Sequence, residues 1–334
     1  MINVAIVGLG WWGRRIVASL DGQSEKLRIV LAVDARADAA AELPESQRPR
    51  TVTELNDALA DDTIDAIILA TPHSLHEEQI LRCAEAGKHV FSEKPLTLTT
   101  ASAKRVVAAC NAANVVLGVG HMRRYEPALV EIKRLVDSGE LGTLMHVESN
   151  FSHDLLADVD PADWRASADE SPIPALSAMA IHLTDAYLHL FGPIEEVYAL
   201  STSRAGRWGA GDVLTVQFRF ASGMTGSLST LLVTPMYVRF QVFGGDAWVE
   251  ALSDVHPGSE GVTRLTISRS GTERTSSELH SIDTVRANLE AFADAVEGRT
   301  PYPFTSAEKI GNVAVMEAVI QSAATNLPVS VEAA

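Results

Sequence analysis

A glycine-rich turn near the start of the chain constrains its fold more than any other feature. The run GLGWWG at residues 8–13 follows an apolar stretch and precedes an amphipathic segment that ends at Leu20. In a strand–turn–helix unit, the first glycine permits the turn, the second lets backbone approach a pyrophosphate, and the third lets the helix pack on the strand. The pattern predicts a dinucleotide site that includes Gly8, Gly10, Trp11, Trp12 and Gly13.

An acidic residue narrows the choice of dinucleotide. A second apolar strand is predicted at residues 27–33, and it ends at Asp34. This aspartate lies about 20 residues beyond the glycines, where a carboxylate binds the ribose hydroxyls of the adenosine. Its charge would repel a 2′-phosphate, so the sequence favours NAD over NADP. Arg36 would partly offset that repulsion, which leaves NADP the less favoured alternative.

The length and the net charge of the chain limit the class of protein it can be. A chain of 334 residues exceeds the usual size of a single hydrophobic core, so two domains are expected. The net charge of −16 argues against nucleic acid or an anionic membrane as a partner. The apolar N-terminus lacks a basic region, and no apolar run reaches about 18 residues, so a cytoplasmic protein is expected.

The two cysteines, Cys83 and Cys110, fall in helix-like segments without the spacing of metal ligands. We expect them to be buried free thiols, as in a reducing compartment. No metal site is predicted from the sequence.

The first third of the chain alternates strands with helices. This alternation predicts a doubly wound parallel sheet, a Rossmann fold, over residues 1–122. Beyond the first two strands, the expected strands cover residues 64–70, 89–92 and 115–119, and the expected helices cover 77–86 and 100–113.

The pattern changes after His121 to a period of two, which is typical of half-buried strands. Residues 123–334 are therefore predicted to form a substrate-binding and oligomerisation domain, an α+β fold with a large, mostly antiparallel open sheet. A half-polar second sheet face favours a homo-oligomer. The expected strands cover 144–151, 195–201, 213–220, 225–233, 236–243, 246–252 and 262–268, and the expected helices cover 127–138, 174–191, 284–297 and 306–325.

One long segment, residues 152–175, has no clear periodicity and includes Pro161, Trp164 and Arg165. Loops of this length in compact domains are often functional. We expect this segment to form a lid near a ligand.

Polar residues follow two of the predicted parallel strands, where ligands bind in doubly wound sheets. Lys94 lies at one such strand end, where it can bind a substrate hydroxyl and ease its deprotonation, since desolvation lowers the pKa of a lysine. His73 and His76 have no third ligand at helical spacing, so we expect them to line the adenine or pyrophosphate edge rather than hold a metal. The cofactor residues predicted at these strand ends are Thr71, Pro72, His73, His76, Glu93 and Lys94.

Several motifs occur in order along the chain. They are the glycine fingerprint, Ala-Thr-Pro at 70–72, Glu-Lys-Pro at 93–95, Arg-Tyr-Glu-Pro at 124–127, Ser-Gly-Glu-Leu-Gly at 138–142 and His-Leu-Thr-Asp at 182–185. Together they resemble the glucose–fructose oxidoreductase, inositol dehydrogenase and rhizopine catabolism family (Gfo/Idh/MocA) of NAD(P)-dependent oxidoreductases. The resemblance implies dimers or tetramers built through the open sheet, sugar or cyclitol substrates, and Lys94 and His182 as catalytic residues.

The chain departs from the family pattern at Ala178. Members of the family commonly carry an aspartate four residues before the catalytic histidine, where it could orient the imidazole and raise its basicity. Either His182 works with another partner, or it binds substrate without acting as the base. Asp154, Asp163 and Asp185 are the candidate replacements, and Asp185 is nearest in sequence.

Other predicted contacts come from the second domain. Trp164 and Arg165 resemble a family segment that approaches the nicotinamide. Asn150 and His153, near the end of the first strand of this domain, are expected to face the same cleft. The predicted substrate-binding residues are Lys94, Arg124, Asn150, His153 and Asp185.

These observations favour an NAD-dependent dehydrogenase that oxidises a secondary hydroxyl of a sugar, cyclitol or related cyclic alcohol. A dehydrogenase of a carboxylated cyclic dihydrodiol is a close alternative. An enzyme that uses tightly bound NAD for net elimination or glycoside cleavage is a second alternative, and a non-catalytic NAD-binding regulator is a third. The sequence leaves the substrate, its stereochemistry and the reaction direction open.

Overall fold

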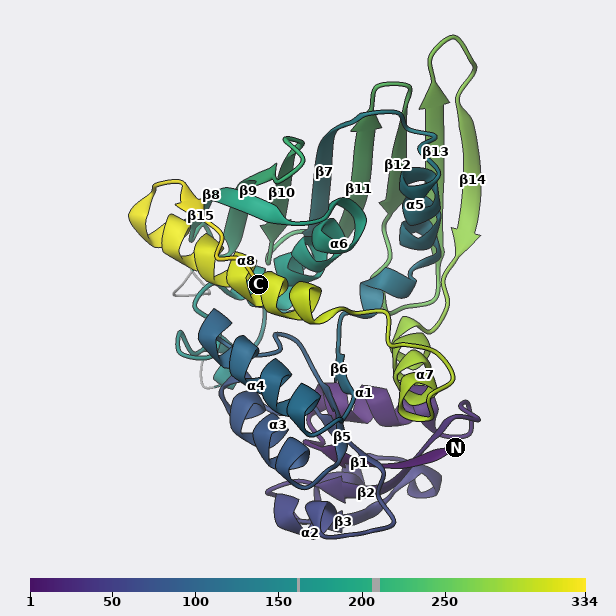
Figure 1. Cartoon of the computed structure of the whole chain (residues 1–334), viewed down its shortest axis with the longest axis vertical. Coiled ribbons are helices and arrows are strands. Elements are labelled where there is room, and N and C mark those ends of the chain that lie inside the picture. The colour runs from purple at the N-terminus through teal and green to yellow at the C-terminus, as the bar shows by residue number, and fades with distance from the viewer. Residues whose placement is uncertain (161–162, 206–210) are drawn as a thin grey trace. The chain divides into compact units, whose positions relative to one another are not determined.

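This computed structural model describes residues 1–160, 163–205 and 211–334, which form two compact units (Figure 1). Unit 1 contains Met1–Met122 and Val285–Ile310, and unit 2 contains Arg123–Thr284 and Gly311–Ala334. The sequence-based division had placed residues 285–310 in the second domain, so that boundary is corrected here. Pro161 of the predicted lid lies outside the described residues.

Unit 1 is built on a six-stranded sheet with the order β3-β2-β1-β4-β5-β6. All of its strand pairs are parallel, which confirms the predicted doubly wound sheet. Its two central strands are apolar apart from Asn3, as strands covered on both faces require. The strands are β1 Ile2–Val7, β2 Leu27–Val33, β3 Arg50–Val52, β4 Ala66–Leu69, β5 His89–Ser92 and β6 Leu117–Val119.

Helices flank this sheet, and α3 packs against α4 (Figure 1). Thr99 begins α4 with a capping box, in which its side chain accepts the backbone N–H of Ser102. The helices are α1 Trp11–Leu20, α2 Leu55–Leu59, α3 His76–Glu85, α4 Thr100–Ala112 and α7 Thr284–Val296.

The late helix α7 belongs to unit 1 because its apolar face completes the core of that unit. Leu289 and Phe292 are fully buried, and the Phe292 ring lies 5.6 Å from that of Phe91 on β5, centroid to centroid. The Tyr302 hydroxyl also donates to Asn288 on α7 at 2.7 Å. This late segment therefore folds back onto the first sheet. Nδ2 of Asn288 donates to the carbonyl of Val119 on β6, although the two residues are 169 positions apart in the sequence.

Unit 2 is built on a nine-stranded sheet with the order β14-β13-β12-β11-β7-β10-β9-β8-β15. Its strand pairs are antiparallel except for β7 with β10, which confirms the predicted mostly antiparallel sheet. The two edge strands, β14 and β15, were not predicted. The strands are β7 Leu144–Ser152, β8 Ile194–Thr202, β9 Val213–Phe220, β10 Thr225–Leu231, β11 Tyr237–Gly244, β12 Ala247–Ser253, β13 Val262–Arg269, β14 Thr275–His280 and β15 Val329–Ser330.

Helices α5 (Pro127–Asp137), α6 (Ile181–Phe191) and α8 (Ser306–Thr325, of which residues from Gly311 onward belong to unit 2) lie over one face of this sheet (Figure 1). Tyr187 on α6 is fully buried among Phe218, Phe220 and Phe240 of the sheet. The predicted helix over 174–191 is confirmed as one uninterrupted helical segment, which contains a π-helical turn at Leu176–Ala180 and continues as α6.

Candidate functional site

The glycine turn has the shape that a pyrophosphate requires. Gly8 has φ +93°, and a Cβ there would lie 2.6 Å from the carbonyl oxygen of Ala70. A Cβ on Gly13 would overlap the carbonyl of Gly8, whereas nothing lies within 4 Å of one on Gly10. Gly10 caps α1 without a side-chain hydrogen bond, so the N-terminus of this helix is open to an anion. These residues fit a dinucleotide.

Asp34 lies at the end of β2 beside this turn. Its carboxylate accepts the backbone N–H of Leu9 at 2.8 Å and that of Arg36 at 2.9 Å. A carboxylate has further acceptor sites, so these contacts leave it able to bind ribose hydroxyls. The exposed Arg36 guanidinium donates to Glu42 at 3.0 Å, and Glu42 also pairs with Arg14.

Lys94 follows β5 at the carboxyl edge of the sheet, and both of its neighbours are fixed. Its backbone N–H donates to the carboxylate of Glu93 at 3.2 Å. The carbonyl of Pro95 accepts from Nδ1 of His76 at 2.8 Å, across a cis Lys94–Pro95 peptide. The main chain on each side of this lysine is thus tied to unit 1.

Glu93 is almost completely buried at this strand end. Burial raises the pKa of its carboxyl group, and the indole of Trp12 and the charge of Lys94 oppose that shift only in part. A Cβ on Gly120 would overlap the same carboxyl group, so Gly120 makes room for it. Trp12 in the glycine turn and Lys94 after β5 therefore both act on the pKa of one buried acid.

His76 joins two strand ends. Its Nε2 lies 3.1 Å from the carbonyl of Thr71 after β4, while its Nδ1 bonds to Pro95 after β5. The His73 ring packs edge-on against it, with 5.9 Å between centroids. Their predicted contact with the cofactor stays a prediction.

In unit 2, His182 lies in the first turn of α6 and is buried. The π-helical turn immediately before it contains Ala178, and π-turns inside helices are frequent at functional sites. The Ala178 methyl group offers no hydrogen bond. Of the three aspartates considered as replacements, Asp154 is exposed and Asp163 accepts the backbone N–H of Arg165 at 2.9 Å.

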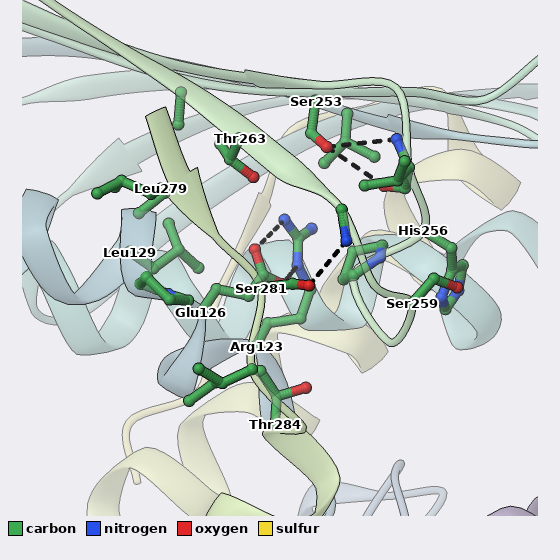
Figure 2. Close-up of a pocket in the computed structure, with 18 of the residues that line it drawn as sticks. Arg123, Glu126, Leu129, Ser253, His256, Ser259, Thr263, Leu279, Ser281 and Thr284 are labelled. Atoms are coloured by element: carbon green, nitrogen blue, oxygen red, sulfur yellow. Dashed lines mark hydrogen bonds and ion pairs between the residues drawn. The ribbon is translucent and has the colours of Figure 1, made fainter. Parts of the chain in front are cut away.

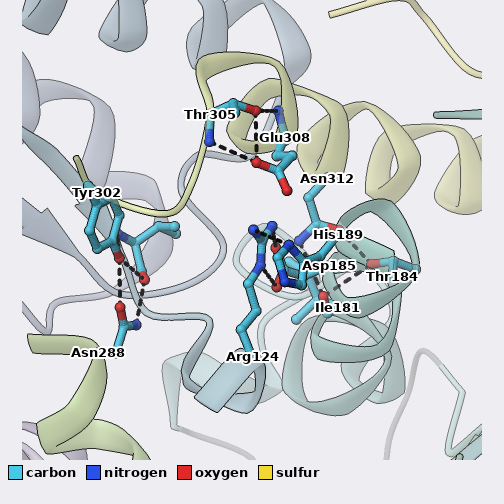
Figure 3. Close-up of polar contacts among 11 residues, drawn as sticks. Arg124, Ile181, Thr184, Asp185, His189, Asn288, Tyr302, Thr305, Glu308 and Asn312 are labelled. Atoms are coloured by element: carbon cyan, nitrogen blue, oxygen red, sulfur yellow. Dashed lines mark hydrogen bonds and ion pairs between the residues drawn. The ribbon is translucent and has the colours of Figure 1, made fainter. Parts of the chain in front are cut away.

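The third, Asp185, forms a buried ion pair with Arg124 (Figure 3). The guanidinium donates to both carboxylate oxygens, at 2.8 and 2.7 Å, and its Nη1 lies 3.2 Å from Nδ1 of His189. Both residues were predicted to bind substrate, and in the structure they bind each other. His189 was not predicted at this site, although its i, i+4 spacing from Asp185 was a signal in the sequence.

A second polar contact fixes the same helix. Thr184 donates to Oδ1 of Asn312 at 2.6 Å, and Nδ2 of Asn312 donates to the Ile181 carbonyl at 3.2 Å (Figure 3). These side chains are buried. Helix α6 is thereby held on two sides, by Arg124 and by α8.

Asn150 and His153 do not share a cleft, which corrects that expectation. Asn150 donates to Ser229 at 2.9 Å and lines the open face of the sheet. His153 packs against Phe151 and His256, with centroids 5.3 and 5.6 Å away. The physical reason is the alternation of a strand, which sends Asn150 and Phe151 to opposite faces.

The described part of the predicted lid contains a compact turn at Trp164–Ala166. The Arg165 guanidinium lies 4.3 Å from the centre of the Trp164 ring and pairs with Asp163 at 3.2 Å. Contact of Trp164 and Arg165 with the cofactor remains a prediction.

Among the described residues, no three His, Cys, Asp or Glu side chains group as a metal site would require. Within the same residues, no helix is both long and apolar enough to cross a membrane.

Residues 2–121 match the model of an oxidoreductase family with an NAD-binding Rossmann fold, GFO_IDH_MocA. Residues 129–250 match the model of the GFO/IDH/MocA C-terminal domain. The chain belongs to the GFO/IDH/MocA family. It is therefore an NAD(P)-dependent oxidoreductase, which confirms the resemblance drawn from the motifs.

Individual relatives differ in what they act on. The chain is 28% identical to 4-carboxy-2-hydroxymuconate-6-semialdehyde dehydrogenase of a Sphingobium species, over 81% of this chain and 87% of that protein. It is 29% identical to D-xylose 1-dehydrogenase (NADP(+)) 2 of Haloferax volcanii, over 93% of each. Its fold superposes on levoglucosan dehydrogenase in complex with NADH and levoglucosan with a TM-score of 0.84, at 22% identity over 99% of each chain.

Proposed function

We propose that this oxidoreductase is an NAD-dependent dehydrogenase that oxidises a secondary hydroxyl of a sugar, cyclitol or related cyclic alcohol. Bound nicotinamide would supply the hydride acceptor. Residues 8–13 and Asp34 would hold the cofactor, and Lys94 and His182 would act on the alcohol. The names of the Haloferax and levoglucosan relatives support a sugar or polyol substrate.

The observation that carries this proposal is the anchoring of Lys94. Glu93 and Pro95, on either side of it, are held by hydrogen bonds to the lysine's own backbone and to His76. A preorganised backbone lets the ammonium group bind the reacting hydroxyl in one orientation and stabilise the developing alkoxide.

His182 would assist by holding the substrate or by accepting the hydroxyl proton. Its helix is fixed at Asp185, three residues further along, by the ion pair with Arg124. This arrangement supports a precisely placed imidazole even though Ala178 cannot orient it.

The preference for NAD is supported by the environment of Asp34. Its carboxylate lies beside the phosphate-binding turn, and the Arg36 guanidinium is already paired with Glu42. A 2′-phosphate would meet the negative charge of Asp34 there, and Arg36, whose Nε lies 3.9 Å from Asp34, offsets that charge only in part. We expect kcat/KM for NAD to exceed that for NADP at least tenfold, and Asp34→Ala to reduce the ratio. Equal values for the two cofactors would contradict the preference.

A homo-oligomer formed through the open sheet face is also proposed. Tyr198, Leu200 and Tyr237 are large exposed side chains that line a hollow on this face, 36%, 44% and 42% exposed. Contact with a second copy of the chain would remove these apolar groups from water, which favours association. Leu200→Glu should shift the mass measured by light scattering toward the monomer, whereas a wild-type monomer would contradict the proposal.

The substrate is tested by NADH absorbance over a panel of inositols, aldoses, glycosides and dihydrodiol acids. The proposal predicts turnover with a cyclic alcohol or sugar. No turnover with any compound of the panel, together with NAD that copurifies and does not exchange, would contradict the proposal. That result would favour the alternative of a net non-redox reaction. Exchangeable NAD without turnover on any substrate would instead favour a regulator.

A further inference from the structure

A small cavity in unit 2 is distinct from the residues discussed above. It lies among the start of α5, strands β11 to β14 and the 255–261 loop (Figure 2), and its space for water-sized groups is about 30 Å³. That space holds roughly two water molecules, about the bulk of one carboxylate group. The hydroxyl-bearing side chains on its wall are Ser253, Ser259, Thr263, Ser281 and Thr284.

Two basic side chains, Arg123 and His256, lie on this wall among the described residues. Arg123 is 2% exposed. Its Nε and Nη2 donate to Glu126 at 2.5 and 3.1 Å, and its guanidinium lies 4.9 Å from the centre of the Phe151 ring. Its Nη1 is buried and has no hydrogen-bond partner in the described structure. A buried guanidinium nitrogen normally has an acceptor, because leaving it unsatisfied costs its hydration.

The hydroxyl of Thr284 is the second unsatisfied group on this wall. Its Oγ1 is buried and, among the residues described, has no hydrogen-bond partner. Ser281 adds another donor, because its Oγ already accepts the Gly261 N–H at 2.9 Å and keeps its own hydrogen to donate. Arg123 Nη1 and the hydroxyls of Thr284 and Ser281 therefore give the wall three groups that can donate to an anion.

The N-terminus of α5 adds positive potential. Pro127, Ala128 and Leu129 of its first turn line the cavity, and Glu126 caps the helix without a side-chain hydrogen bond. The partial positive charge of a helix start favours an anion nearby. Among the described residues of the wall, Glu126 is the single acidic one, and it forms an ion pair with Arg123.

We infer that this cavity binds a carboxylate, one oxygen on Arg123 Nη1 and the other on the hydroxyls of Thr284 and Ser281. A carboxylate matches both the size of the space and its two sets of donors. The carboxylate would belong either to the substrate or to a separate metabolite. The binding claim itself does not depend on the proposed dehydrogenase activity.

Binding is tested on the purified full chain with sodium formate, against sodium chloride at equal ionic strength and against formamide, its neutral counterpart. We expect formate alone to raise the Tm saturably and to titrate calorimetrically. Thr284→Val, which keeps the volume, should weaken formate binding about tenfold, as expected for one hydrogen bond to a charged group. Thr266→Val, at a half-buried position of β13 outside the cavity wall, is the matched control and should bind like the wild type.

Arg123→Lys should weaken formate binding at least as much as Thr284→Val does, because an ammonium group lacks the second nitrogen of the guanidinium fork. If that variant does not fold, Thr284→Val decides the question. Formate that behaves like chloride, or unchanged formate binding in Thr284→Val, would overturn the inference and leave only buried water in the cavity.

Steady-state kinetics in the presence of formate distinguish a carboxylate of the substrate from that of a separate metabolite. Formate that competes with the substrate, together with a preference for a carboxylated substrate over its amide, would assign the cavity to the substrate. Formate that changes kcat without competing would assign it to a separate effector. If no panel substrate turns over, the proposed function fails while the calorimetric result still decides the carboxylate site.

Discussion

Arg124 and Asp185 stand 61 positions apart in the chain and form a two-point ion pair whose side chains are each 3% exposed. The arginine comes from the turn that opens unit 2, and the aspartate comes from the helix that contains His182. The pair therefore ties the predicted catalytic helix to the first residues of its own unit. Its energetic consequences can be measured.

Asp185→Asn should lower the free energy of unfolding by about 3–5 kcal/mol, because Arg124 would keep a buried charge without its counter-charge. Urea denaturation followed by circular dichroism measures this. Glu78→Gln, which removes a surface ion pair with Arg82, is the matched control and should change little. Equal midpoints for the two variants would contradict a stabilising role for the pair.

His76→Phe should lower kcat more than it changes the substrate KM. The substitution keeps an aromatic ring but removes the hydrogen bonds to Thr71 and Pro95, so the backbone next to Lys94 loses an anchor. We expect a loss of stability of about 1–3 kcal/mol as well. His280→Phe, at an exposed position on β14, is the control. A rise in KM with unchanged kcat would argue against a positioning role.

Glu93 should make stability depend on pH. Because burial raises the pKa of its carboxyl group in the folded state, the folded chain holds this proton more tightly than the unfolded chain. The stabilisation that this protonated carboxyl group gives the folded state is fully present below the unfolded pKa of about 4.3, and it is lost as pH rises through the folded pKa. The stability of Glu93→Gln relative to the wild type should therefore increase from pH 4.5 to 7, measured by urea midpoints. A constant difference over this range would contradict the assignment.

The two cysteines should be unreactive in the native protein. Both are buried, and burial raises the pKa of Cys83 to about 12 and that of Cys110 to about 11. At pH 8 almost no thiolate is present, and the thiolate is the reactive form. A thiol reagent should label neither cysteine until guanidinium unfolds the chain, when both should react. Rapid labelling of the native protein would show that these helices open.

The local parts of the fold could be predicted from the sequence. Apolar runs such as Ile64–Ala70 are typical of covered parallel strands, and the glycine turn defines its own strand and helix. These signals lie within one element and its neighbours. They also position Lys94, because a strand end follows directly from its strand.

Contacts between distant segments could not be predicted in this way. The packing of Phe292 on Phe91 and the pairing of Arg124 with Asp185 depend on which surfaces meet in the folded chain, and no periodicity records that. The π-helical turn before His182 was hidden as well, because its apolar residues also fit an ordinary helix. Asn150 was misplaced because one step along a strand reverses the face.

The central claim is that Lys94 binds and activates the reacting hydroxyl. Steady-state kinetics of Lys94→Ala test it most directly, with the substrate found in the panel and with the affinity for NADH measured separately by fluorescence. We expect kcat to fall about 10²–10⁴-fold while NADH affinity stays close to that of the wild type and of Lys133→Ala, a half-buried control on α5. A Lys94→Ala enzyme that retains the wild-type kcat would contradict it.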